Sequence, residues 1–166
     1  ILIIGAFVLA FVSANAQEET EKKSKKELKA EKKALLIDQT KELVENKTFL
    51  FIAKSANPSS GKTVQINNYT VKVRNDSITS YLPYYGRSYS TTYGSSTSPF
   101  HFTLAADKVT SEETKKGYKI KIDVNYKTEK LEYTFNIEET GTTTLNVYSV
   151  NRQPISYRGE IGKLTK

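Results

Sequence analysis

The chain has 166 residues, with 25 lysines and arginines against 18 acidic residues, one histidine and no cysteine. Without cysteine, this sequence contains no disulfide, no thiolate metal site and no cysteine for lipid attachment. The net charge of +7 is scattered along the chain instead of forming one basic stripe, which argues against nucleic acid as a partner.

Residues 1–16, ILIIGAFVLAFVSANA, form an uncharged apolar run that ends in small residues. Ala14-Asn15-Ala16 has the small-x-small pattern of a signal peptidase site, so cleavage is expected between Ala16 and Gln17. A transmembrane anchor is the alternative, but the apolar run is shorter than the roughly 20 residues that a span needs. We therefore expect a periplasmic or secreted single domain with no transmembrane segment in its mature form.

Residues 17–47 are rich in Lys, Glu, Ala and Leu and contain no Gly or Pro, which predicts a charged N-terminal helix. The apolar residues of this segment share one helix face: Leu28, Leu35, Leu36, Leu43 and Val44. We expect a solvated first part that leads into a docked second half. A lysine-rich arm that binds a surface is the alternative.

From Thr48 onwards the hydrophobic period changes to two, which predicts strands. The strands expected in this half cover residues 48–53, 63–66, 69–74 and 78–82. Asn67-Asn68 and Asn75-Asp76 tolerate the positive φ of tight turns, so we expect the last three of these strands to form a meander.

Alternation is strictest in the C-terminal half. Residues 118–126 and 131–137 each place every second residue on an apolar face, and further strands are expected at 142–150 and 155–161. We expect residues 48–166 to form one antiparallel β domain of about eight strands in a curled sheet, closed as a barrel or as a sandwich. With the N-terminal helix, the fold class is mainly β (α+β).

Candidate catalytic residues are sparse. His101 is the only histidine and lies on the polar face of a short strand, and the sequence has no nucleophile elbow and no Gly-rich phosphate loop. The acidic residues, including Asp123, Glu129 and Glu132, are expected on helix faces or on outward strand positions. We therefore expect no catalytic residue, no metal site and no cofactor, with a carboxylate-based hydrolase as the alternative.

The most unusual stretch is residues 80–102, which holds five of the eleven tyrosines of the chain: Tyr81, Tyr84, Tyr85, Tyr89 and Tyr93. Tyrosine combines a flat apolar body with a polar tip, which suits surfaces that bind sugars or peptides. Tyrosine also packs well at the corners of sheets, where its hydroxyl finds a backbone partner. Both interpretations stay open at this point.

Two motifs carry a family resemblance. They are LPY-x-GR-x-Y, in residues 82–89, and R-x-x-I-x-Y-x-G, in residues 152–159. Together with the flanking strands they resemble domain-of-unknown-function family 4251, exported proteins found mainly in Bacteroidetes. The resemblance implies the location and a shared fold, and it implies no activity.

Arg87 and Arg152 are both expected in turns that leave strands, and such turns can lie on the same rim of a β structure. We therefore expect one polar-aromatic patch that contains Tyr84, Tyr85, Arg87, Tyr89, Arg152 and Tyr157. The predicted function is non-enzymatic binding of a small ligand, a glycan or a peptide at this rim. The alternative is a structural or protein-interaction component of the cell envelope, in which the tyrosines are packed corner residues.

Overall fold

The computed structural model describes residues 24–59, 61–89 and 98–164. The expected signal peptide, the first residues of the expected helix and Tyr93 lie outside these ranges. The described elements are α1 (Lys25–Glu45), β1 (Thr48–Pro58), β2 (Val64–Arg74), β3 (Ser77–Leu82), β4 (Phe100–Ala105), β5 (Lys108–Thr114), β6 (Gly117–Tyr126), β7 (Glu129–Glu138), β8 (Thr142–Ser149) and β9 (Arg152–Gly162).

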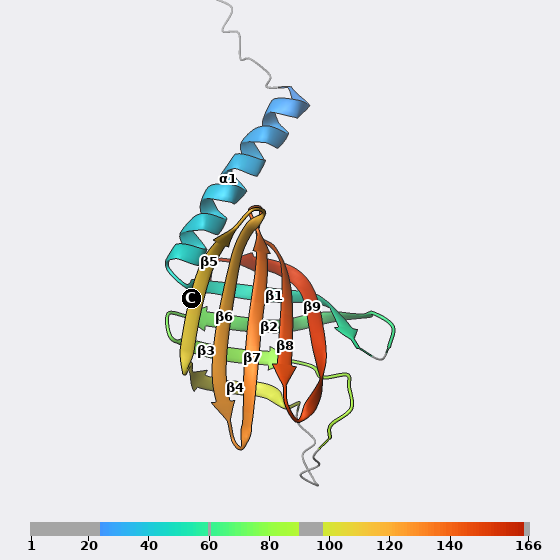
Figure 1. Cartoon of the computed structure of the whole chain (residues 1–166). Helices are drawn as coiled ribbons and strands as arrows, with labels where there is room; N and C mark the ends of the chain where they lie inside the picture. Colours follow the sequence, from blue (N-terminus) through green and yellow to red (C-terminus); the bar gives the residue numbers. More distant parts are fainter. Residues whose placement is uncertain (1–23, 60, 90–97, 165–166) are drawn as a thin grey trace, which may run out of the picture.

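The nine strands form one antiparallel sheet with the order β4-β3-β2-β1-β9-β8-β7-β6-β5. The sheet is curled so that β1 to β4 cross behind β6, β7 and β8 (Figure 1). The predicted curled, mainly β fold with one helix is confirmed, with nine described strands where about eight were expected. The sheet is a half-barrel, because β4 and β5 are its two edges and do not pair with each other.

The sheet bends at β1, which lies beside the central strand β9. The pairing of β1 with both of its neighbours, β2 and β9, shifts between Ala53 and Ser55. On the β9 side Ala53 pairs with Gly159 and Ser55 pairs with Arg158, so Lys54 is an extra residue. Such bulges bend a strand and increase its twist, which allows the two halves of the sheet to face each other.

The core lies between the two halves of the curled sheet. Leu131, Tyr133, Phe135 and Ile137 of β7 are all buried, as the alternation of the sequence predicts. Phe135 contacts Phe49 of the opposite half edge-on, with 5.4 Å between ring centroids. Edge-to-face pairs of this kind contribute beyond the apolar area that they bury.

Two local predictions have different outcomes. The turn at Asn75-Asp76 is confirmed, with Arg74 paired to Ser77 and Asn75 at a φ of 49°. The expected hairpin at Asn67-Asn68 is wrong, because β2 runs through these residues without a turn. Residues 66–68 form a bulge opposite Lys54, and this bulge accommodates the φ of 64° at Asn68.

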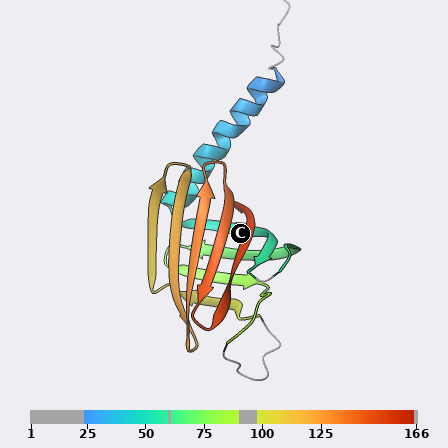
Figure 2. The ribbon, with the colours of Figure 1, turned by 45° about the vertical axis from the view of Figure 1, so that its right-hand side comes forward.

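Helix α1 begins with a capping box, in which the Ser24 side chain accepts from the backbone of Glu27 and the Glu27 side chain accepts from the backbone of Ser24. Only Thr40, Leu43 and Val44 of this helix are buried. The other leucines of the expected apolar face are exposed, so the helix docks through its last turns and not through its whole second half. In Figure 2 its remaining length projects away from the strands.

Within the described residues, no helix has the length and apolar character needed to cross a membrane.

Candidate functional site

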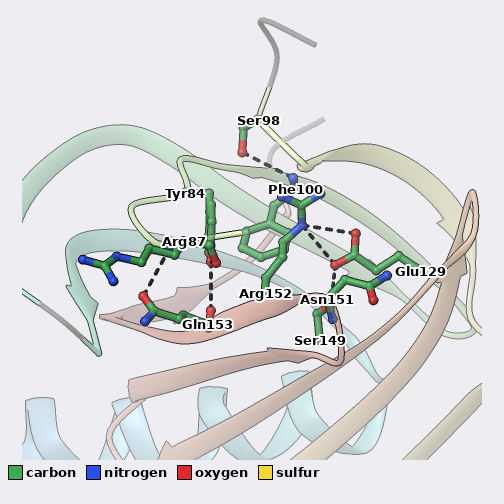
Figure 3. A network of polar contacts seen from close by, with 9 residues as sticks. All are labelled: Tyr84, Arg87, Ser98, Phe100, Glu129, Ser149, Asn151, Arg152 and Gln153. Atoms are coloured by element: carbon green, nitrogen blue, oxygen red, sulfur yellow. Dashed lines mark hydrogen bonds and ion pairs between the residues drawn. The ribbon is translucent and has the colours of Figure 1, made fainter. Parts of the chain in front are cut away.

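The candidate site lies where the segment 83–89, which follows β3, runs beside the start of β9 (Figure 3). The Gln153 N–H donates to the Arg87 carbonyl (3.0 Å), and the Arg87 N–H donates to the Gln153 side-chain oxygen (3.2 Å). Ser88 and Arg152 form an antiparallel bridge between the two segments. We call residues 83–89, together with Arg152 and Gln153 at the start of β9, the rim. The expected meeting of Arg87 and Arg152 at one end of the β structure is therefore observed.

Tyr84 connects the two segments of the rim to each other and to the core. Its hydroxyl lies within hydrogen-bond distance of two carbonyl oxygens, those of Arg87 (2.9 Å) and Gln153 (3.1 Å). Its ring meets Phe100 edge-on at 5.2 Å, and the Arg152 guanidinium carbon lies 5.7 Å from the ring centroid. Tyr84 therefore joins the rim segment both to β9 and to the core.

Tyr157 supports the same segment from the core. Its side chain is fully buried, and its hydroxyl donates to the Pro83 carbonyl at 2.6 Å. Tyr157 thus lies beneath the rim, away from solvent, and its contribution is to hold the start of the segment. The sequence correctly places it near the rim.

A buried ion pair fixes the other side of the rim. Glu129, only 8% exposed, lies against Arg152, whose Nε is 3.0 and 3.1 Å from the two carboxylate oxygens. The Ser149 hydroxyl also donates to Glu129 and accepts the N–H of Asn151 at 3.0 Å. Hydrogen bonds to both oxygens compensate the carboxylate for its lost water.

The expected outward position of Glu129 is wrong. Glu129 is the first residue of β7 and shares a face with Leu131 and Tyr133, both of which are buried. The two-residue period therefore places Glu129 on the inner face as well. The sequence signal was the alternation itself: continued two residues N-terminal to Leu131, it places Glu129 on the buried face of β7.

The outward residues of the rim are Tyr85, Arg87 and Tyr89. Tyr85 is 38% exposed and Tyr89 is 67% exposed, and the Arg87 side chain points away from the polar network (Figure 3). The Tyr89 backbone is fixed all the same, because its N–H donates to the Asn151 carbonyl at 2.8 Å. The six expected site residues thus form an outer set, Tyr85, Arg87 and Tyr89, and an inner set, Tyr84, Arg152 and Tyr157.

The single histidine lies elsewhere. The His101 ring stacks on Tyr81 of the neighbouring strand, with 4.3 Å between centroids, and Tyr81 in turn stacks on Tyr69 at 5.3 Å. Among the described residues, no three histidine or carboxylate side chains are grouped so as to hold a metal ion. The described part of the rim therefore offers hydrogen bonds, charge and aromatic surface.

Burial raises the pKa of three tyrosines above the usual value of about 10: Tyr84, Tyr133 and Tyr157. For Tyr84 the Arg152 charge opposes this shift in part. A raised pKa favours the protonated, folded form, so this stability is present below about pH 10 and is lost as the pH rises further. In an absorbance titration followed in parallel by circular dichroism, we expect the two most deeply buried of them, Tyr133 and Tyr157, to ionise only as the protein unfolds. Ionisation of every tyrosine in the intact fold would contradict this.

Comparisons with known proteins agree on one family. The family model described as "Domain of unknown function (DUF4251)" matches residues 31–161. A crystal structure of a DUF4251 family protein from Bacteroides eggerthii is similar with a TM-score of 0.56 and 12% identity, over 78% of this chain and 88% of that one. At this identity the likeness shows a shared fold. A search of curated proteins gives no match.

Proposed function

The chain belongs to the DUF4251 family, and we propose that it is an exported, non-catalytic protein that binds a carboxylate-bearing ligand at the outer set of the rim. The proposal rests mainly on one observation. Tyr85, Arg87 and Tyr89 are exposed, while the backbone of Arg87 and Tyr89 is tied to Gln153 and Asn151 by three hydrogen bonds. Side chains on a fixed backbone lose less conformational freedom on binding than side chains on a loose loop.

Arg87 is the residue that selects the ligand charge. A guanidinium group donates two parallel hydrogen bonds to a carboxylate, which gives both energy and orientation. Among the residues that the structure describes, no acidic side chain pairs with Arg87, whereas Arg152 is paired with Glu129. Arg87 is therefore available to a ligand, and Arg152 serves to hold the rim.

The tyrosines on either side of Arg87 supply the contact surface. Tyr85 and Tyr89 flank it in the chain, and both expose part of their rings. Aromatic rings of this kind pack against sugar rings and peptide side chains at a low cost in side-chain entropy. Acidic glycans and acidic peptides both provide the carboxylate, and location outside the cytoplasm, proposed from the apolar leader, gives access to both.

The test is a calorimetric titration with acidic oligosaccharides and acidic peptides, each compared with its neutral methyl ester or amide. We expect Arg87→Ala and Tyr89→Ala each to weaken binding about tenfold or more, the effect of losing a charge-assisted hydrogen bond or an aromatic anchor. Arg158→Ala and Tyr148→Ala are the matched controls, because both residues are exposed on neighbouring strands outside the rim. Equal binding by the four variants would refute the proposed site.

The second candidate function is structural, as part of an assembly of the cell envelope. The inner set favours it, because the hydroxyls of Tyr84 and Tyr157 bond to backbone carbonyls inside the fold. If this is the whole role of the rim, Tyr84→Ala will lower the melting temperature, Arg87→Ala and Tyr89→Ala will leave it nearly unchanged, and no acidic probe will bind the natural protein. Binding of the acidic probes, and its loss in the two outer variants, therefore separates the two functions.

A further inference from the structure

The two edges of the sheet differ in charge. The edge strand β5 carries Lys108, Glu112 and Glu113, and such charges discourage another strand from pairing with it. The other edge strand, β4, has the sequence FHFTLA and contains no lysine, arginine or acidic residue. Both views show β4 as the outermost strand of the β1–β4 layer (Figures 1 and 2). The β4 edge therefore lacks the charged side chains that discourage another strand from pairing with it.

The register of the sheet identifies the backbone groups on the open side of β4. In an antiparallel pair, alternate residues direct both backbone groups to the same neighbour. Arg74 and Ser77 flank a two-residue turn, so Ser77 exchanges its backbone hydrogen bonds with β2. The next residue, Ile78, therefore directs its backbone groups towards β4, where it pairs with Leu104. The bond from the Ala106 N–H to the Asp76 carbonyl (2.6 Å) continues this even-numbered series.

The odd-numbered residues of β4, His101, Thr103 and Ala105, therefore direct their backbone groups away from β3. The His101 N–H is already used, because it donates to the Ser98 carbonyl at 3.2 Å. Both backbone groups of Thr103, both groups of Ala105 and the carbonyl of His101 face outward. Thr103 lies at the centre of this row.

We propose that β4 is a self-association edge, where a second copy of the chain adds its own β4 in the antiparallel direction. A two-fold axis beside Thr103 places Thr103 opposite Thr103 of the second copy and His101 opposite Ala105 of that copy. Every pair then joins residues with outward backbone groups, so the edge is complementary to itself. The pairing makes one continuous sheet from two.

Two further features fit a second copy. Each copy carries a net charge of +7, which opposes association in general, but β4 brings no like charges together at the junction. The stack of Tyr69, Tyr81 and His101 crosses three strands and ends on β4. An added β4 strand extends the exposed face of that stack across the junction.

A single introduced cysteine tests the geometry, because the natural sequence has none. Directly paired residues of a hydrogen-bonded antiparallel pair have Cα atoms about 5.5 Å apart, within the range that a disulfide spans. Under mild oxidation we expect Thr103→Cys to form about tenfold or more disulfide-linked dimer than Thr110→Cys. Thr110 is the matched control, an exposed threonine in the middle of the charged edge strand β5.

Sedimentation equilibrium of the unmodified protein gives the second measurement. We expect its average mass to rise from monomer towards dimer with concentration. Thr103→Lys is expected to remain monomeric with an unchanged circular dichroism spectrum, because two like charges then oppose each other across the two-fold axis. A monomeric natural protein at every concentration, or equal cross-linking of the two cysteine variants, would overturn the proposal. Neither result depends on whether the rim binds a ligand.

Discussion

Replacing Arg152 by alanine is expected to lower the free energy of unfolding by about 3 kcal/mol, or roughly 10 °C in melting temperature. Arg152 is the cation beside Glu129, a carboxylate that is only 8% exposed. Removal of the guanidinium leaves that negative charge buried and unpaired, and this cost exceeds the loss of one ion pair at a surface. The variant also removes the cation beside the ring of Tyr84. Urea denaturation measures the change.

Two further variants isolate the cause. Arg158→Ala removes an exposed arginine from the same strand and should change the stability by less than about 0.5 kcal/mol. The double variant Glu129→Gln/Arg152→Ala should recover a large part of the loss, because the amide is neutral and still bonds to Ser149. If the double variant is no more stable than Arg152→Ala, the unpaired charge is not the cause of the loss.

The strands that pack on both sides of the core were predictable from the sequence. In β6 and β7 every second residue is apolar, since one face of each strand meets the core and the other meets solvent. The turn at Asn75 was predictable for a related reason, because asparagine tolerates a positive φ. Each of these signals is local, and each depends on a few neighbouring residues.

The features that depend on distant parts of the chain were not predictable. Asn68 has the positive φ that its residue type suggests, but its conformation forms a bulge because β1 pairs beside it. Strand β5 has the sequence KVTSEET, in which Val109 is the single apolar residue, and it is a strand because β6 pairs with it along its whole length. The curl of the half-barrel likewise depends on the bulges at Lys54 and at residues 66–68, which lie opposite each other only because β1 pairs with β2.

The candidate site shows the same division. The motifs around Arg87 and Arg152 pointed to one rim, and the structure places them there. The separation into an outer and an inner set could not be read from residue types, because Tyr84 and Tyr85 are identical neighbours in the sequence. Their different exposure is set by Phe100, which packs against Tyr84 from another strand.

Gly159→Ala is expected to be at least as damaging as the loss of Arg152, at about 3 kcal/mol or more of unfolding free energy. A Cβ atom at this position would lie 2.0 Å from the backbone oxygen of Ile52 and 3.0 Å from the ring of Phe51. The nearest obstacle is the backbone of β1, which is paired on both sides and cannot move aside as a flexible side chain can. The variant must therefore open the bulge around Lys54 or separate β9 from β1.

Gly162→Ala is the matched control, because it makes the same chemical change three residues later in the same strand. Among the residues that the structure describes, no atom beyond the immediate chain neighbours lies within 4 Å of a Cβ built at Gly162, so the stability should change by less than about 0.5 kcal/mol. The comparison removes the general effect of replacing glycine, which acts through the flexibility of the unfolded chain and is similar at both positions. The remaining difference in stability measures the steric clash where β9 pairs with β1 beside the bulge. Equal stability of the two variants in urea denaturation would show that the two strands separate there at little cost, and that the bulge does not fix the curl of the sheet.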